Sequence, residues 1–315
     1  DDYYRQSLRE VGYTGPLSMY DCTLSPRTAL ARKNSEVISM HNYQSHPKNW
    51  VKTGSTLQMD STIKNHFVTL GTMFAQQQPG KPFLTTEFLH CFWDKYRFEQ
   101  GLSEGALSSF QDVDGIMNHQ LPVVLKRPET PIKTFRIYQD PVARASEVVS
   151  NAVFMNKSAK PATERLAFAF DPEKILDTPY AEKKFLEPQR DLALQTRVGI
   201  TFDPAAAEKA GWTVVKADES LENKTAADFR IPAGETFFRL DDKNGTFAVT
   251  LPEIEGIAAL EKGEYQLDQL QLRNSAPGAF TLISRDGRPL NRSQKMLLVV
   301  ATDALNQNMR FDADD

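Results

Sequence analysis

Residues 81–99 read KPFLTTEFLHCFWDKYRFE and carry the clearest signal for the architecture. The apolar and β-branched run 82–86 predicts a strand, which leads directly into Glu87. In parallel α/β sheets and barrels, ligands and catalytic groups lie at the carboxyl ends of the strands. We therefore expect Glu87 at the mouth of a site. The alternative interpretation is a strand-end carboxylate that forms an ion pair with Arg97 or Lys81.

Working outward, the first half of the chain, residues 1–156, alternates short apolar runs with longer amphipathic stretches. This alternation is typical of strands and helices that take turns in a parallel α/β sheet. Strands are predicted at residues 16–20, 36–41, 82–86 and 115–118. Helices are predicted at residues 2–11, 27–33, 60–77, 97–110 and 141–155.

The second half changes character. Residues 157–211 contain five prolines between short helical pieces, and we interpret them as a wrapping connection. Residues 212–315 show short strands separated by turn signals, of which Asn244-Gly245 and Asp286-Gly287 are hairpin-type. This pattern predicts an antiparallel β domain at the C-terminus.

The composition limits the classes of protein. Of the 315 residues, 40% are apolar and 25% are charged, which is typical of a globular protein with one large domain or two ordinary ones. Lys and Arg number 37 against 41 Asp and Glu, so the net charge is −4. No global basic field exists that would bind nucleic acid or an anionic membrane. A neutral or small polar partner is favoured.

No apolar run approaches the ~20 residues that cross a bilayer, and the first ten residues, DDYYRQSLRE, lack the features of a signal peptide. We expect a soluble chain that is mature or cut. The two cysteines, Cys22 and Cys91, build neither a disulfide framework nor a four-cysteine zinc site. Core thiols are favoured over a bridge between them.

A second polar cluster, residues 39–47 (SMHNYQSHP), also follows a predicted strand. His41 and His46 lie five residues apart without the helical i, i+4 spacing of a zinc protease, so no metal site is predicted. Hydrogen bonding of His41 and Tyr43 to a polar ligand is the functional interpretation. His46 is otherwise a buried residue that holds the loop at Pro47.

A third cluster, residues 110–120 (FQDVDGIMNHQ), surrounds the last predicted strand of the first half. Asp112 and Asp114 lie at its amino end, where carboxylates cap or pair, and structural roles are preferred for both. Three polar residues at the carboxyl end are expected to line the pocket: Asn118, His119 and Gln120. Asp21, after the first predicted strand, is either a further candidate carboxylate or a polar rim residue.

In chain order, the segments PLSMYDC, VISMHNYQSHP, KPFLTTEF with KYRFE, and SSFQDVDGI resemble strands five to eight of the (β/α)8 barrel of clan A glycoside hydrolases. The bacterial β-galactosidase-like or β-agarase-like group looks most similar. The resemblance implies an α/β fold in which residues 1–156 form the C-terminal half of a TIM barrel. An antiparallel β-sandwich-like domain would follow at 212–315, after the wrapping connection.

The resemblance also implies an activity: hydrolysis of a β-galactoside or related polysaccharide by a retaining mechanism. Glu87 matches the nucleophile, and His41 and Tyr43 match positions that face it. We expect His90, Trp93 and Asn118 to bind the carbohydrate as well, with no metal and no cofactor. A secreted or periplasmic location is implied by the resemblance alone.

The chain departs from the family pattern at the acid/base. In this clan the acid/base is the Glu of an Asn-Glu pair after strand four, and the sequence contains no Asn-Glu dipeptide. We expect the N-terminal half of the barrel, from the same protein or a second chain, to supply it, because a half barrel leaves two open sheet edges. The alternatives are a non-catalytic carbohydrate-binding protein with a degenerate barrel and an unrelated α/β enzyme that uses His41 and Glu87 with a metal.

Overall fold

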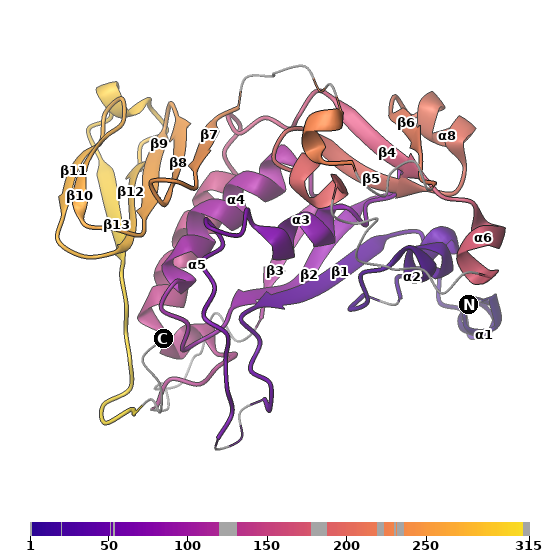
Figure 1. Cartoon of the computed structure of the whole chain (residues 1–315), viewed down its shortest axis with the longest axis horizontal. Helices are drawn as coiled ribbons and strands as arrows, with labels where there is room; N and C mark the ends of the chain where they lie inside the picture. The colour runs from indigo at the N-terminus through magenta and orange to yellow at the C-terminus, as the bar shows by residue number, and fades with distance from the viewer. Residues whose placement is uncertain are drawn as a thin grey trace.

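The computed structural model shows a mixed α/β protein (Figure 1). It describes residues 2–19, 21–50, 52, 54–119, 131–177, 188–218, 224–229, 231 and 236–310. Within these residues, two three-stranded parallel sheets accompany a five-stranded antiparallel sheet and a separate β-hairpin. No helix of the described residues combines the length and the apolar character needed to cross a membrane.

The first parallel sheet holds the residues singled out from the sequence. Its strands are β1 (Ile38–Gln44), β2 (Phe83–His90) and β3 (Gly115–Asn118), and they lie side by side in chain order. The three predicted strands are confirmed, and β1 and β2 extend further toward their carboxyl ends than predicted. The strand ends therefore reach the polar residues that follow each apolar run.

The segment predicted as a strand at 16–20 is not a strand in its described part, 16–19. It nevertheless runs beside β1, because the amide of Val37 donates to the carbonyl of Leu17 and the amide of His41 donates to that of Asp21. These two backbone hydrogen bonds, at the ends of the segment and without a β-ladder between them, hold the segment alongside β1. Asp21 is thereby fixed next to His41.

The helices mostly follow the prediction. They are α1 (Asp2–Glu10), α2 (Pro26–Ala31), α3 (Val68–Phe74), α4 (Gln100–Phe110), α5 (Pro141–Phe154), α6 (Pro172–Asp177) and α8 (Pro204–Lys209). Short 3-10 turns are η1 (Arg32–Asn34), η2 (Arg97–Glu99), η3 (Ile137–Gln139), η5 (Ala226–Asp228) and η6 (Leu290–Arg292). The predicted helix 60–77 shrinks to α3, because His66 and Phe67 adopt left-handed φ values of 56° and 55° that a helix cannot contain.

Helices α4 and α5 pack closely against each other, which two glycines of α4 allow. A Cβ atom at Gly101 would lie 2.9 Å from the backbone of Ser146, and one at Gly105 would lie 2.7 Å from the carbonyl oxygen of Ser150. Asp140 caps α5 by accepting a hydrogen bond from the amide of Val142 at 2.9 Å. The helix pair lies over the face of the first sheet from which Asn118 donates to Glu104 and Glu147.

Residues 157–211 are more regular than the predicted wrapping connection. They contain β4 (Arg165–Ala169) and β5 (Arg197–Thr201), which join β6 (Thr213–Lys216) in a second parallel sheet of order β5-β4-β6. Pro172 and Pro204 begin α6 and α8, where the missing amide donor costs nothing, instead of interrupting the strands. Pro179 lies outside the described residues.

The antiparallel sheet is confirmed, although it begins well after residue 212. Its strands are β7 (Phe238–Asp241), β8 (Thr246–Leu251), β9 (Ile254–Ala259), β12 (Gly278–Ser284) and β13 (Met296–Ala301), in the order β13-β12-β9-β8-β7. The hairpin of β10 (Gly263–Gln266) and β11 (Gln271–Asn274) lies over its outer face, where Leu270 packs with Ala248 and Ile257. Asn244-Gly245 forms the predicted turn between β7 and β8, with Gly245 at φ 63°.

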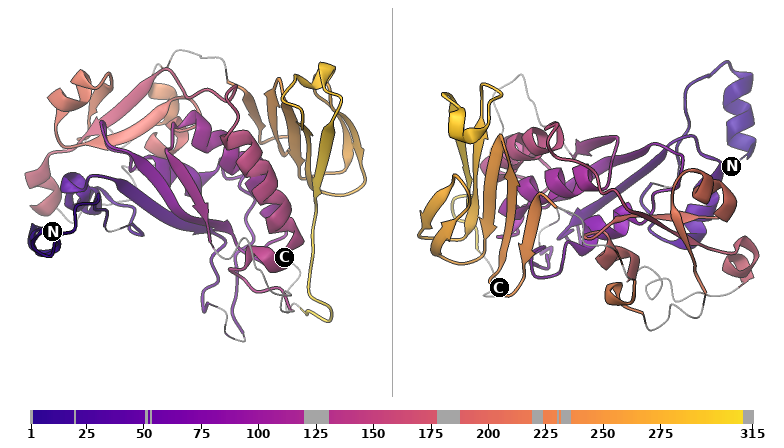
Figure 2. Two further views of the ribbon diagram at one scale, coloured as in Figure 1. Left: turned by 180° about the vertical axis from the view of Figure 1, so that it is seen from behind. Right: turned by 90° about the horizontal axis from the view of Figure 1, so that it is seen from above.

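The sheets and helices share one apolar core. Figure 2 shows the antiparallel sheet stacked against α5 in views from behind and from above. Phe67 and Phe247 meet at 4.8 Å between ring centroids, and Phe110 meets Phe238 at 5.1 Å. Because residues from both halves of the chain interdigitate, the antiparallel sheet fixes the helices that back the first parallel sheet.

Candidate functional site

Glu87 lies on β2, beside His41 of β1 in the sheet register. The Tyr43 hydroxyl donates a hydrogen bond to Glu87 Oε2, and His119 Nδ1 lies 3.7 Å from the same oxygen. The Glu87 side chain is 35% exposed, so solvent and ligands reach it. Two side chains, Tyr43 of β1 and His119 after β3, thus converge on the Glu87 carboxylate of β2.

The hydrogen bond between Tyr43 and Glu87 has a defined direction. Burial and then the neighbouring Glu87 carboxylate raise the pKa of the Tyr43 hydroxyl well above its ordinary value. The hydroxyl therefore stays protonated and donates, while Glu87 accepts. Within the described residues, Glu87 Oε1 has no hydrogen bond or ion pair, so this second oxygen remains available to a ligand.

A register shift brings Glu87 onto the face of Tyr43. Met40 pairs with Thr85 and His41 pairs with Glu87, so Thr86 is an extra residue in β2. An extra residue reverses the alternation of side chains between the two faces of a sheet, and bulges commonly re-aim a side chain in this way. His41, Tyr43 and Glu87 consequently share one face.

His119, and not Asn118, joins Glu87. Neighbouring residues on a strand point to opposite faces. Asn118 donates its amide to Glu104 of α4 and to Glu147 of α5, on the helix-covered face of the sheet. The prediction that Asn118 lines the pocket is therefore wrong, because Asn118 points into the helix layer.

Five rings form an aromatic wall, and two of them, Tyr43 and His119, reach the Glu87 carboxylate: Tyr43, His46, Trp50, His119 and Phe135. Phe135 is central, at 5.2 Å from Tyr43, 5.3 Å from His46 and 5.9 Å from Trp50 between ring centroids. Trp50 is 63% exposed and presents a broad apolar surface to solvent. His46 also contacts the carbonyl of Pro47 at 2.8 Å, as predicted, although it is exposed instead of buried.

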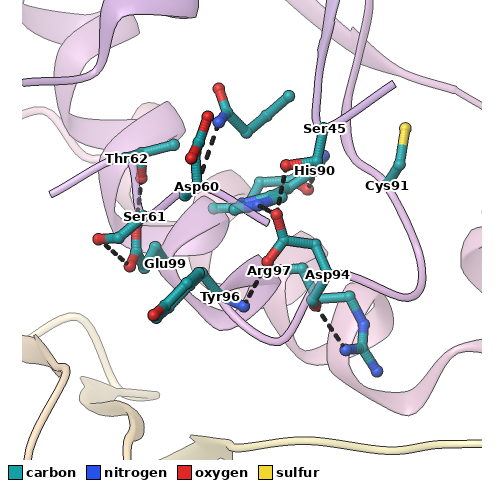
Figure 3. A network of polar contacts seen from close by, with 12 residues as sticks. Ser45, Asp60, Ser61, Thr62, His90, Cys91, Asp94, Tyr96, Arg97 and Glu99 are labelled. Atoms are coloured by element: carbon teal, nitrogen blue, oxygen red, sulfur yellow. Dashed lines mark hydrogen bonds and ion pairs between the residues drawn. The ribbon is translucent and has the colours of Figure 1, made fainter. Parts of the chain in front are cut away.

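His90 is not part of this surface. Its ring is 1% exposed, and Nε2 lies 2.9 Å from Oδ2 of the buried Asp94 (Figure 3). Burial acts to raise the pKa of Asp94, but His90 together with the Ser45 hydroxyl and the Tyr96 amide lowers it. His90 lies an odd number of residues after Glu87 and faces the opposite way, so the predicted ligand contact is wrong.

Trp93 is half-buried and meets Phe92 edge to face at 6.4 Å. No ring contact in the described part of the chain joins it to the aromatic wall. The two cysteines are free: Cys91 is buried, as expected of a core thiol, whereas Cys22 is exposed.

The ion pairs considered for Glu87 as a structural residue do not form. The buried Arg97 donates to Asp140 at 2.7 Å and to Asp303 at 2.8 Å, and the Lys81 ammonium donates to the carbonyl of Lys33. Figure 3 shows the Arg97 guanidinium at the carbonyl of Asp94, and the buried Glu99 accepting from Ser61 and Thr62. This network ties the loop after β2 to its surroundings and leaves Glu87 without a cationic partner from Arg or Lys in the described residues.

Asp112 and Asp114 have the structural roles predicted for them. Asp112 forms an ion pair with Arg197, and Asp114 accepts a hydrogen bond from the amide of Phe83 at 2.8 Å. Asp21 belongs to the rim of the site, where its Oδ2 lies 3.5 Å from His41 Nδ1. Gln120 lies outside the described residues.

No protein-family model matches the chain, and searches of curated proteins and of solved structures give no match either.

Proposed function

We propose that the protein is a retaining glycoside hydrolase that cleaves β-linked glycosidic bonds, with Glu87 as the nucleophile. One observation carries the proposal: the hydrogen bond from Tyr43 to Glu87 at the carboxyl ends of two adjacent parallel strands. Tyr43 and His119 hold Oε2, and Oε1 is left to attack an anomeric carbon. A carboxylate held in this way is oriented before the substrate binds, which lowers the entropic cost of attack.

The aromatic wall supports a carbohydrate as the substrate. The exposed ring of Trp50 packs beside Phe135, which contacts Tyr43, the hydrogen-bond partner of Glu87. Sugar rings present apolar C–H faces between polar hydroxyl groups, and His41, whose ring centroid lies 6.5 Å from that of Tyr43, supplies a polar partner. A β-galactoside or a related oligosaccharide or polysaccharide is the proposed substrate class.

We extend the proposal to the architecture: the segment beside β1 and the three strands of the first parallel sheet correspond to strands five to eight of a (β/α)8 barrel. Chain order and spatial order agree from the segment beside β1 through β3. One face carries Asn118 toward α4 and α5, while the opposite face carries Glu87 toward solvent, as outer and inner faces of a barrel would. The antiparallel sheet with its hairpin would be the C-terminal β-sandwich-like domain.

A retaining mechanism needs a second carboxyl group about 5–5.5 Å from the nucleophile. The hydrogen bond and the ion pair that Glu87 makes in the described residues come from Tyr43 and His119, neither of which carries a carboxyl group. We propose that the other half of the barrel supplies the acid/base, from the same protein or a second chain. In the first step that acid protonates the leaving oxygen while Glu87 forms a bond to the anomeric carbon. In the second step its conjugate base takes a proton from the water that attacks this carbon and releases the sugar from Glu87.

The test is Glu87→Gln in the complete protein, assayed on activated aryl β-glycosides. The rate should fall by at least about 10³-fold, because the amide cannot form the glycosyl intermediate. Glu264→Gln is the matched control, since that side chain is 76% exposed on β10. Tyr43→Phe should lower kcat by about 10- to 100-fold, as expected for one hydrogen bond to a charged group. Near wild-type turnover by Glu87→Gln would refute the proposal.

A second candidate function is carbohydrate binding without hydrolysis. It is favoured by the same absence of a carboxylic acid among the contacts that Glu87 makes in the described residues. Two assays together distinguish the two functions: oligosaccharide binding and hydrolysis of aryl β-glycosides. A binding protein would retain oligosaccharides on an affinity gel and release no sugar from any aryl β-glycoside, whereas the hydrolase would do both.

A further inference from the structure

We propose that Asp21, Cys22 and His41 form a binding site for a zinc-like transition-metal ion. The three residues offer one carboxylate oxygen, one thiolate sulfur and one imidazole nitrogen, and these atoms all lie within 4.8 Å of one another. Nothing in the glycosidase proposal requires this metal, and the inference stands without that proposal.

The distances fit a tetrahedral ion. Bonds of about 2.0–2.3 Å to zinc separate neighbouring ligand atoms by roughly 3.3–3.8 Å in a tetrahedron. His41 Nδ1 and Asp21 Oδ2 are already 3.5 Å apart. The Cys22 sulfur lies within 4.8 Å of both atoms and belongs to an exposed side chain.

The backbone holds the ligands in place before any ion arrives. The amide of His41 donates to the carbonyl of Asp21 at 2.8 Å, which fixes two of the three residues relative to each other. Thr23, which follows Cys22, accepts hydrogen bonds at its carbonyl from Thr28 Oγ1 at 2.8 Å and from Arg32 at 3.1 Å. Cys22 therefore sits between two anchored residues, and supporting contacts of this kind strengthen metal sites.

The donor set selects the class of metal. One sulfur, one nitrogen and one oxygen suit Zn²⁺ or Co²⁺, and exclude Mg²⁺ and Ca²⁺, which prefer oxygen ligands. Three protein ligands leave the fourth position open, as in catalytic zinc sites. Asp21 is 44% exposed and Cys22 is exposed, so water or a ligand hydroxyl reaches that position.

Cobalt titration of the reduced, metal-stripped protein tests the site. We expect one equivalent of Co²⁺ to bind, with a thiolate-to-cobalt charge-transfer band and tetrahedral visible bands. Cys22→Ser should abolish the charge-transfer band and weaken Zn²⁺ binding by at least about 100-fold, more than loss of a supporting contact costs. Cys91→Ser, at the buried second cysteine, should keep the band wherever the variant folds.

X-ray absorption on the zinc-loaded wild-type protein gives a readout that needs no variant. One sulfur with nitrogen and oxygen neighbours is expected. A zinc shell without sulfur, a cobalt band that survives Cys22→Ser, or no saturable binding would each overturn the inference. Glu87→Gln should bind the metal as wild type does, so a failed glycosidase proposal and a failed metal site give different results.

Discussion

Glu104 is a buried carboxyl group whose ionisation should weaken the fold. It is fully buried on α4, where Asn118, Ser150 and Gln100 donate to Oε2, while Oε1 has no partner in the described residues. Burial raises its pKa from 4.5 to about 7, and the nearby Glu147, whose own pKa burial also raises, adds to the effect. The folded state thus holds this proton more tightly than the unfolded chain does.

The sign and size of the pH effect follow from linkage. Between pH 4.5 and 7 the folded protein binds more protons than the unfolded chain at this group, so the unfolding free energy falls as pH rises. At 1.36 kcal/mol for each pH unit, the loss reaches about 3 kcal/mol above pH 7. Glu104→Gln removes this loss, because an amide does not ionise and its oxygen can accept the bonds that Oε2 accepts.

Urea unfolding followed by tryptophan fluorescence measures the effect. The difference in unfolding free energy between Glu104→Gln and wild type should shift by about 3 kcal/mol in favour of the variant from pH 4.5 to pH 8. Glu264→Gln, at an exposed glutamate, should show no such shift. Parallel stability curves for Glu104→Gln and wild type over this range would refute the reasoning.

Two further predictions concern the buried ion pair of Arg97 with Asp140 and the aromatic wall. Arg97→Ala should lower the unfolding free energy by about 3–5 kcal/mol, because it leaves Asp140, which is 3% exposed, as an uncompensated buried charge. A loss of less than about 1 kcal/mol, measured by thermal unfolding, would contradict this prediction. Trp50→Ala should change stability by less than about 0.5 kcal/mol, since the ring is 63% exposed. The same variant should weaken oligosaccharide binding by about 3- to 10-fold in calorimetry, and unchanged affinity would remove Trp50 from the site.

The sequence predicts those parts of the fold that local patterns determine. The runs that form β1, β2 and β3 are apolar or β-branched and end in polar residues. Their strand structure and the position of the candidate site at their carboxyl ends could therefore be predicted. Asn244-Gly245 likewise specifies its turn through the positive φ of glycine. The strands β4 and β5 were missed because prolines that begin helices resembled interruptions of an irregular segment.

Part of the candidate site was also predictable from local sequence patterns. Glu87, His41 and Tyr43 follow strand ends directly, and these residues do converge. Of the two adjacent residues expected to line the pocket, His119 lies beside Glu87 and Asn118 does not, because the phase of a strand depends on pairing with its neighbour, which a single run of residues does not reveal. Phe135 has no local signal, since only the tertiary fold brings it to Tyr43.

The central claim, that Glu87 is the nucleophile of a retaining glycosidase, is tested most directly by trapping the intermediate. The complete protein is incubated with a 2-deoxy-2-fluoro glycoside that carries an activated leaving group, and its peptides are analysed by mass spectrometry. We predict one sugar adduct for each chain, on the peptide that contains Glu87. An adduct on a different carboxylate, or turnover of aryl β-glycosides without any trapped adduct, would contradict the claim.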